Sequence, residues 1–371
     1  MTDPIHIVCL DAPSPADYGG AIDMHWKIRA LAQSGRKIIL HYFNYREERG
    51  AGDLAPFCMA VHKYSRKNLA HSLPLNLPYT VASRINKELV KRLNEDDHPV
   101  LLEGLHTAGI LPFLDPLRKK LLRMHNVEST YYRKLSLAER NPWRRAYYQL
   151  ESSRLHRFQQ TLDPSLPIAC ISLDDREELS ARYALKNQYF IPAFLPWQEV
   201  KGMEGHGDYC LYHGNMTVTE NEAAASWLIT EVFSRLSIPL VIAGRGISKR
   251  LMLQAKAHSQ VSVVSDPAES ELNDLISRAH VHVLPSLNRT GVKLKLLHAL
   301  FEGRFCITNS NGVSGSGIGE MAIIAQTAGE FADRISTLMD SSFTGADKKN
   351  RQQLLAIYDN RANARKINEL L

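Results

Sequence analysis

Apolar residues recur along the chain in short runs that alternate with stretches of helical spacing. The first run, Ile5–Leu10, is followed by a polar loop, a helical pattern from Ala21 to Gln33, and a second run at Lys37–Tyr42. Gly35 ends the helical pattern between the two runs. A strand, loop, helix and strand in this order are typical of doubly wound α/β proteins.

The same alternation continues in two series. In the first series we expect strands at Phe57–Val61, Val100–Glu103, Lys120–Met124 and Ile168–Ser172, with helical stretches near Val81–Leu93 and from about Val127 to Leu162. In the second series we expect strands at Tyr209–His213, Pro239–Ala243, Val261–Val264 and Val281–Leu284, with helices at 220–236, 248–258 and 269–279 and a further helix that opens at Gly291. The pattern therefore predicts two doubly wound parallel sheets.

Between the two series, residues 191–207 have early prolines, later glycines and little periodicity, which is the composition of a linker. We therefore expect a Rossmann-like domain over residues 1–190, the linker 191–207, and a second Rossmann-like domain over 208–345. The polar helical tract 346–371 is expected to pack back on the first domain. Two such sheets predict a cleft between the carboxyl ends of their strands.

Composition is typical of an ordinary soluble globular protein, with 44% hydrophobic and 23% charged residues among 371. We find no apolar run long enough to span a bilayer and no signal-peptide pattern at the start, so we expect a cytoplasmic protein. The five cysteines have no C-x-x-C spacing. They predict reduced core thiols and no metal site.

A formal net charge of +6 allows an anionic partner, and many of the basic residues are concentrated in one region. Residues 118–157 hold eleven Lys and Arg against three Glu, with Tyr, Trp and Phe side chains interleaved. Such a face can rest on an anionic membrane surface, which would make the protein peripheral on the inner face of the membrane. A solvated helix face is the alternative. No recognised nucleic-acid-binding module accompanies the region, so we expect no nucleic-acid partner.

Two loops have the chemistry of anion sites. Gly19 and Gly20 precede the first helix, where a missing Cβ lets a ligand approach the backbone, although a glycine pair also suits a plain turn. Lys293 is expected in the first turn of the helix that opens at Gly291, where a cation does not suit the helix dipole but suits a phosphate. An ordinary solvated lysine is the alternative.

Taken together, these residues resemble the two-domain (GT-B) retaining glycosyltransferases of the "group one", or family 4-like, class. The resemblance covers nearly the whole chain and rests on PSPADYGG, LLEGLHTAG, RMHNVESTYYRKL, IPAF, YCLYHGN, VIAGRG and TGVKLKLLHALFEG, in that order. It implies transfer of a hexosyl group from a nucleotide diphosphosugar to a glycan or lipid-linked acceptor, as in polysaccharide biosynthesis. It also implies retention of anomeric configuration and catalysis without a metal or other cofactor.

The resemblance also suggests roles for individual residues. Breakage of the sugar–phosphate bond leaves a diphosphate, so cations and helix N-termini must stabilise negative charge. The resemblance assigns this to Arg245, which follows Gly244, and to Lys293 with the amides of Gly291 and Val292. His125 matches the family histidine that lies close to the reacting sugar, with Asn126, Gly19 and Gly20 on the same wall; a structural histidine is the alternative.

The sequence departs from the family at its hallmark pair of glutamates, whose positions are Thr290 and His298 here. Thr290 is expected to bond a sugar hydroxyl, and His298 a ribose hydroxyl with Glu302 orienting it. The basic pair usual after the first strand of the second domain is also missing. These losses leave open a degenerate nucleotide- or glycan-binding homologue. A nucleotide-sugar epimerase would need carboxylates such as Glu103 and Glu128, which we otherwise place on the acceptor side with Asn126.

Overall fold

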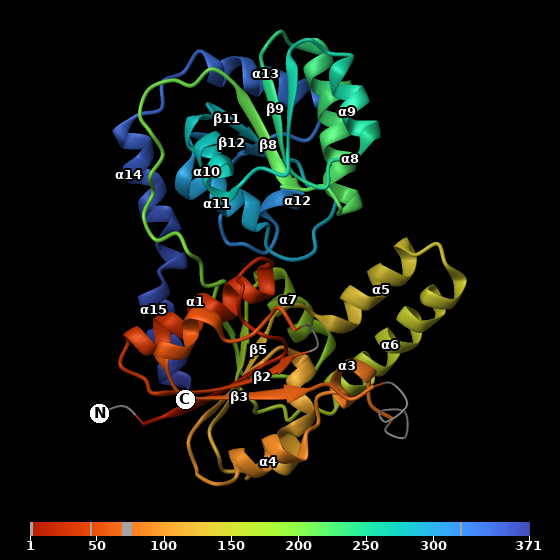
Figure 1. The fold of residues 1–371 in the computed structure, drawn as a ribbon, viewed down its shortest axis with the longest axis vertical. Coiled ribbons are helices and arrows are strands. Elements are labelled where there is room, and N and C mark those ends of the chain that lie inside the picture. Colours follow the sequence, from red (N-terminus) through yellow and green to blue (C-terminus); the bar gives the residue numbers. More distant parts are fainter. Residues whose placement is uncertain (1–2, 45–46, 69–75, 320) are drawn as a thin grey trace. The chain divides into compact units, whose positions relative to one another are not determined.

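The structure, a computed structural model, describes residues 3–44, 47–68, 76–319 and 321–371. The chain forms two compact α/β units (Figure 1). The first unit comprises Met1–Pro196 together with Tyr358–Leu371, and the second comprises Trp197–Ile357. Each unit has one parallel sheet between layers of helices, which is the predicted fold class.

The first unit has a seven-stranded sheet in the order β3-β2-β1-β4-β5-β6-β7, and every pairing in it is parallel. Its strands are β1 (Ile5–Cys9), β2 (Ile38–Asn44), β3 (Cys58–Ser65), β4 (Val100–Glu103), β5 (Lys120–Met124), β6 (Ile168–Cys170) and β7 (Gln188–Phe190). Its α-helices are α1 (Gly19–Gln33), α3 (Tyr79–Ala82), α4 (Lys87–Leu93), α5 (Glu128–Ala138), α6 (Pro142–Gln160), α7 (Leu173–Arg182) and α15 (Asn360–Leu370).

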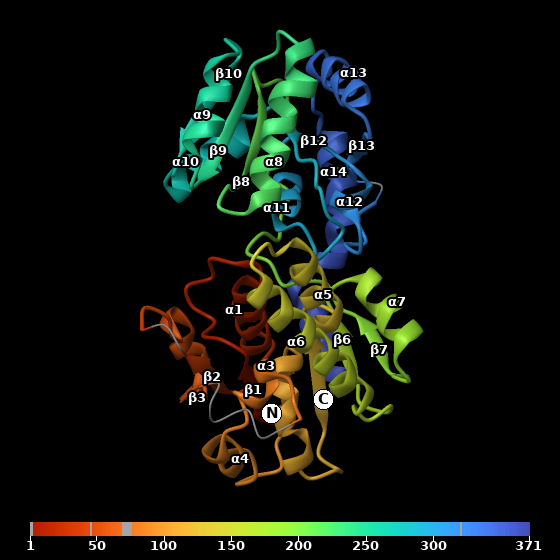
Figure 2. The ribbon, with the colours of Figure 1, turned by 90° about the vertical axis from the view of Figure 1, so that its right-hand side faces the viewer.

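The second unit has a six-stranded parallel sheet in the order β10-β9-β8-β11-β12-β13. Its strands are β8 (Cys210–Asn215), β9 (Leu240–Arg245), β10 (Val261–Ser265), β11 (Val281–Val283), β12 (Phe305–Thr308) and β13 (Ile323–Ile324). Its α-helices are α8 (Thr219–Trp227), α9 (Lys249–Lys256), α10 (Glu269–Arg278), α11 (Leu294–Glu302), α12 (Ser310–Val313), α13 (Ala328–Met339) and α14 (Gly345–Leu354). Helices α8 and α9 cover one face and α10 and α11 the other (Figure 2).

Alternation of side chains along the buried strands builds two cores in the first unit. Ile5 and Ile7 of β1 face α1 and α15, where they pack with Ile28, Leu31 and Ile367. The intervening positions face the opposite layer. There Val8, Leu102 and Leu122 pack with side chains of α4, α6 and α7. Residues on the α1 side of neighbouring strands are therefore brought together, including charged ones.

Several sequence-based boundaries were wrong. The expected helix from Val127 to Leu162 is two antiparallel helices, α5 and α6, because Glu139 to Asn141 leave the helical conformation before Pro142 starts α6. The tract 346–371 is likewise not one helix: α14 belongs to the second unit and α15 to the first. The start of the expected linker is packed, since Phe194 and Leu195 are fully buried.

Within the described residues, no helix is long and apolar enough to cross a membrane. All five cysteines are free thiols, four of them buried and Cys58 half-buried.

Candidate functional site

Each sheet reverses its strand order once, between β1 and β4 in the first unit and between β8 and β11 in the second. At such a point the loops leaving the two strands go to opposite faces of the sheet, which opens a crevice at the carboxyl edge. The predicted site residues of the chain lie at these two edges.

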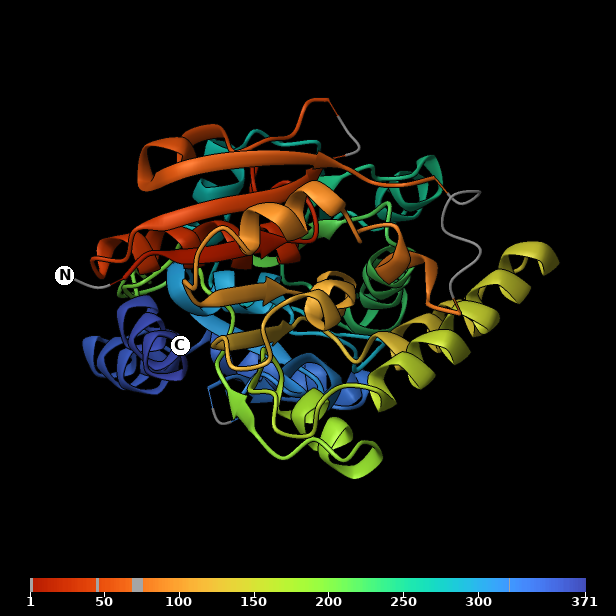
Figure 3. The same ribbon diagram turned by 90° about the horizontal axis from the view of Figure 1, so that it is seen from below.

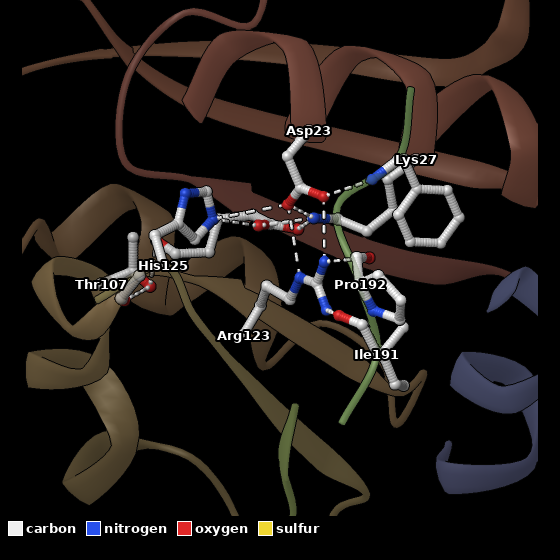
Figure 4. A network of polar contacts seen from close by, with 10 residues as sticks. Asp23, Lys27, Thr107, Arg123, His125, Ile191 and Pro192 are labelled. Atoms are coloured by element: carbon white, nitrogen blue, oxygen red, sulfur yellow. Dashed lines mark hydrogen bonds and ion pairs between the residues drawn. The ribbon is translucent and has the colours of Figure 1, made fainter. Parts of the chain in front are cut away.

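A buried charge network occupies the carboxyl edge of the first unit (Figure 4). Glu103 at the end of β4 is in register with Arg123 of β5, and both point toward α1 because they alternate with core residues that face the other layer. Helix α1 supplies Asp23 and Lys27, which are one turn apart on its buried face. The sheet register and the helix period thus bring two acids and two bases together.

The four charges neutralise one another. Lys27 Nζ lies 2.7 Å from an Asp23 carboxylate oxygen and 2.9 Å from the Glu103 carboxylate, and Arg123 donates to Asp23 at 2.9 Å. All four side chains are at most 1% exposed. Arg123 also donates to the carbonyl of Pro192, and Asp23 accepts from the backbone N–H of Phe194. The network therefore also fixes the chain that leaves β7.

Both carboxyl groups stay ionised. Burial alone would raise the pKa of Asp23, but the Arg123 guanidinium and the Lys27 ammonium outweigh burial and hold its pKa below the usual value. Burial opposes ionisation of Glu103 in the same way, and Lys27 and His125 lower its pKa below the usual value. Breaking such a pair from one side leaves a buried charge uncompensated.

Among the described residues, one group has the spacing of metal ligands: Asp23, Glu103 and His125 offer ligand atoms within 4.8 Å of one another. Lys27 already contacts both carboxylates at hydrogen-bond distance, and Arg123 contacts that of Asp23. A divalent cation here would face two fixed positive charges at close range. The group is better explained as a protein-only ion network that holds His125.

His125 is the member of the network with access to solvent, its side chain being 9% exposed. Its Nε2 is 3.0 Å from a Glu103 oxygen. An ionised carboxylate only accepts hydrogen bonds, so Nε2 carries a proton and donates to Glu103, and Nδ1 is the ring nitrogen that does not face Glu103. A Cβ on Gly20 would lie 3.5 Å from that Nδ1. The structure thus brings Gly20, at the start of α1 beside Gly19, next to the nitrogen that is able to accept a proton.

Glu103 was expected on the acceptor side, but its side chain is fully buried and bonded to Lys27 and His125. That expectation was wrong: Glu103 orients His125 from behind. Glu128, the first residue of α5, lies in a different environment. It is hydrogen-bonded by Asn126, and its carboxylate lies 3.9 Å from His106. Burial raises the pKa of Glu128 to about 7, so it exchanges a proton near neutral pH.

At the carboxyl edge of the second unit, two glycines let strands β8 and β9 meet closely. A Cβ on Gly244 would lie 1.8 Å from the carbonyl oxygen of Gly214, and one on Gly246 would lie 2.5 Å from Thr217. Between them, Arg245 ends β9 opposite Asn215 of β8, with its side chain exposed. Gly244 therefore has a structural reason to be glycine, and Arg245 is presented at the edge.

The loop after β11 does not start the helix where the sequence indicated. Gly291 has a φ of +67°, which excludes it from the helix, and α11 begins at Leu294 with Lys293 as its N-cap. The Lys293 ammonium turns back to donate to the Asn288 side chain at 2.7 Å and to the carbonyl of Thr290. Lys293 thus ties the loop together, with Gly291 and Val292 in the loop and not in the first turn.

The lysine inside the first turn of α11 is Lys295, which sequence reasoning passed over. Its Nζ donates to the Tyr212 hydroxyl at 3.1 Å and to the Asn221 side chain at 2.9 Å, and it lies 4.7 Å from the Tyr212 ring centroid. No carboxylate of a described residue forms an ion pair with it. Burial, with a smaller contribution from Lys293, lowers the pKa of Lys295 to about 8. A buried ammonium held by neutral oxygens, at an uncapped helix N-terminus without acidic residues, is suited to an anion.

His298 lies one turn further along α11 and stacks on Trp197, with ring centroids 4.2 Å apart. Burial, aided by Lys201, lowers the pKa of His298 to about 4, so the ring is neutral at pH 7. Glu302 does not orient His298 as expected, because its carboxylate accepts from Lys201 at 3.2 Å. Thr290 is half-buried in the loop that Lys293 closes.

The residues missed in the sequence had one signal in common. Asp23, Lys27, Arg123 and Lys295 are charged residues inside elements that otherwise read as apolar. Buried charges need partners, so their positions indicate an ion network or a ligand. The partners themselves come from strands and helices far apart in the sequence.

Comparison with known proteins agrees with this arrangement. Residues 207–341 match the family described as "Glycosyl transferases group 1". A curated protein of Klebsiella pneumoniae, described as "Uncharacterized 44.6 kDa protein in cps region", is 28% identical over 352 residues, which cover 89% of each chain. The matched family region contains the whole carboxyl edge of the second sheet.

Solved structures show the same architecture. Sucrose-phosphate synthase from Thermosynechococcus elongatus aligns over 100% of this chain and 98% of its own, with a TM-score of 0.70 and 15% identity. Anabaena HepE in complex with UDP and glucose aligns over 98% of each chain, with a TM-score of 0.64 and 11% identity. At these identities the likeness concerns the fold, which is two Rossmann-like units of GT-B type.

Proposed function

We propose that this protein is a glycosyltransferase that moves a hexosyl group from a nucleotide diphosphosugar to a glycan or lipid-linked acceptor. The second unit binds the donor, and the first unit supplies groups that contact the sugar and the acceptor. The observation that carries the proposal is Lys295, a half-buried cation without a carboxylate partner among the described residues, at the N-terminus of α11. The family match of residues 207–341 includes this helix.

The donor half follows from the chemistry of the leaving group. Cleavage of the bond between the anomeric carbon and the phosphate oxygen places an additional negative charge on the diphosphate. Lys295 and the first N–H groups of α11 offer positive potential at one place, and Arg245 adds an exposed guanidinium at the end of β9, two strands from β11 in the same sheet. These groups stabilise the negative charge of the diphosphate. In the family, a basic pair after the first strand of the second domain does this, and that pair is missing after β8 here.

The first unit offers groups for proton handling. The Nε2–H of His125 is fixed on Glu103, which leaves Nδ1 to accept a hydrogen bond from a sugar or acceptor hydroxyl. Glu128, whose pKa is about 7, is a second group able to take the acceptor proton. His125 and Glu128 have different environments: the His125 ring is held by ionised Glu103, and the Glu128 carboxyl is buried beside Asn126.

We further propose that transfer retains anomeric configuration and proceeds without a metal ion. Both points rest on the resemblance of the sequence and on the protein cations at the edge of the second unit. Incubation with excess chelator tests the metal, and the proton–proton coupling of the product's anomeric hydrogen tests the configuration. The relative whose description names a cps region supports polysaccharide biosynthesis as the setting.

The central test is a screen of the purified chain against UDP-, GDP- and ADP-sugars. A donor raises the melting temperature because it binds the native state, and slow hydrolysis of that same donor, followed by mass spectrometry, shows that its glycosyl bond is activated. The Lys295→Met variant should lose both signals. If a nucleotide binds but no hydrolysis or transfer occurs with any acceptor fraction, the protein is a binding homologue and the enzymatic proposal is wrong.

A further inference from the structure

Helices α5 and α6 form an antiparallel hairpin whose end projects from the first unit (Figures 1 and 3). The second half of α6 is anchored: Leu155 is 1% exposed, and Glu151 accepts hydrogen bonds from the backbone N–H groups of Tyr79 and Thr80. The first half of α6, up to Leu150, lacks this support and extends about 13 Å, at 1.5 Å per residue. We call residues 137–150 the hairpin tip.

The hairpin tip exposes apolar side chains that a folded protein usually covers. Trp143 is 84% exposed, Leu137 68% and Leu150 48%. Trp143, Tyr147 and Leu150 are three or four residues apart, so they form one apolar stripe along α6. All four tryptophans of the chain lie in described segments, and Trp143 is the one that is exposed. Such a stripe on a projecting helix indicates a surface that a membrane or another molecule covers.

Positive charge surrounds the stripe. Arg140, Arg144 and Arg145 are exposed, and none forms an ion pair with a residue that the structure describes. Glu139 is the one acidic residue of the tip. The exposed basic surface is smaller than the basic region 118–157 suggests, because two of its residues are buried. Arg118 forms an ion pair with Asp96, and Arg123 forms one with Asp23.

From this juxtaposition we propose that the hairpin tip binds an anionic phospholipid surface, with Trp143 inserted between headgroups and the three arginines on lipid phosphates. Tryptophan favours the interface between headgroups and acyl chains, and arginines beside it gain attraction from the negative surface potential. The contact does not depend on the transferase activity proposed above, because no residue of the tip belongs to either carboxyl edge.

The size and shape of the tip favour a lipid surface over a protein partner. The stripe from Trp143 to Leu150 is about 10 Å long, at 1.5 Å per residue. A stable protein interface buries on the order of 1,000 Å² or more, which is more than a single apolar stripe of about two helical turns offers. A fluid headgroup layer accommodates a convex, mixed surface of this size, as it does for interfacial amphipathic helices.

The test measures co-sedimentation of the full chain with vesicles of phosphatidylcholine alone and of phosphatidylcholine with about one third phosphatidylglycerol, at low and high salt. We expect binding to the anionic vesicles only, reversed by salt. The variant Arg140→Ala/Arg144→Ala/Arg145→Ala should lower the partition constant on the order of 100-fold, from about fivefold per arginine. Trp143→Ala should weaken binding to the anionic vesicles at low salt, and emission of Trp143 should shift to the blue on binding.

A matched control removes three exposed positive charges from another face of the same unit: Arg361→Ala/Arg365→Ala/Lys366→Ala on α15. This variant should bind as tightly as the unmodified chain. Failure to sediment with anionic vesicles at low salt overturns the proposal, as does equal loss in the two triple variants. A dimer that dissociates on Trp143→Ala in sedimentation velocity overturns it as well, because the tip would then be an interface between copies of the chain.

Discussion

Replacing Lys295 with Met should raise the stability of the ligand-free protein while it weakens donor binding. The pKa of Lys295 falls from 10.5 to about 8 in the folded chain. The folded state therefore disfavours the charged form, and this cost is fully present below pH 8 and relieved as pH rises from 8 to 10.5. Methionine keeps a similar side-chain volume without the charge.

The size of the effect follows from the same pKa. At about 1.4 kcal/mol per pKa unit, the unpaired ammonium costs the fold roughly 3 kcal/mol at pH 7 as an upper bound. The hydrogen bonds to Tyr212 and Asn221 that methionine loses offset part of this, at about 1 kcal/mol each. We expect a net gain of about 1 kcal/mol in the free energy of unfolding. Loss of a charge-assisted contact to phosphate should weaken donor binding by about 2 kcal/mol, or roughly 30-fold.

The assay pairs urea unfolding at pH 7 with calorimetric titration of the donor found in the sugar-nucleotide screen. At pH 8 about half of the Lys295 side chains are neutral, so binding of a diphosphate should take up about half a proton, measured in two buffers of different ionisation enthalpy. Lys295→Met should abolish that uptake. Lys249→Met, at an exposed lysine of α9 in the same unit, serves as the control.

Either of two results would refute the reasoning. Unchanged donor affinity in Lys295→Met would show that the ammonium does not contact the ligand. Proton uptake that is the same in Lys295→Met as in the unmodified chain would show that another group titrates on binding.

Three further changes test other parts of the structure. Glu103→Gln leaves a buried cation uncompensated, so the free energy of unfolding should fall by about 3 kcal/mol. Transfer should slow at least tenfold with little change in donor KM, because His125 is no longer oriented. Equal stability would contradict the buried network. His298→Phe keeps a ring against Trp197, and because the pKa of His298 is about 4 against 6.5 in the unfolded chain, this variant should lose about 2 kcal/mol less stability between pH 7 and pH 5 than the unmodified chain in urea unfolding. Gly244→Ala forces the ends of β8 and β9 apart, and should lower the free energy of unfolding by about 1–3 kcal/mol; a melting temperature equal to that of the unmodified chain would refute the close approach.

Much of the architecture could be predicted from the sequence because strand and helix periods differ. Both sheets and the switch from one series to the next follow from apolar runs such as Ile5–Leu10 and Val281–Leu284. Element ends were less predictable. Gly291 reads as the opening of α11, but its positive φ and the hydrogen bonds of Lys293 to the loop delay the helix to Leu294.

Site residues could be predicted only where the residue type and its position at a strand end or a helix start were enough to identify them. His125 and Gly20 were named from their positions at a strand end and a helix start, and the structure places them together. The different environments of Glu103 and Glu128 could not be predicted. Their difference arises from strand register, which buries Glu103 against Lys27 on α1.

The passage of the chain through α15 has a consequence for synthesis. Ala364 and Ile367 complete the layer that lies against α1, yet they leave the ribosome after the whole second unit has been made. The second unit is continuous in sequence, so it can bury its core as soon as Ile357 has emerged. The first unit has to wait with one side of its sheet incompletely covered until α15 has been made. In cells, the nascent first unit is therefore the part with the longest exposure to chaperones and proteases, although it is made first.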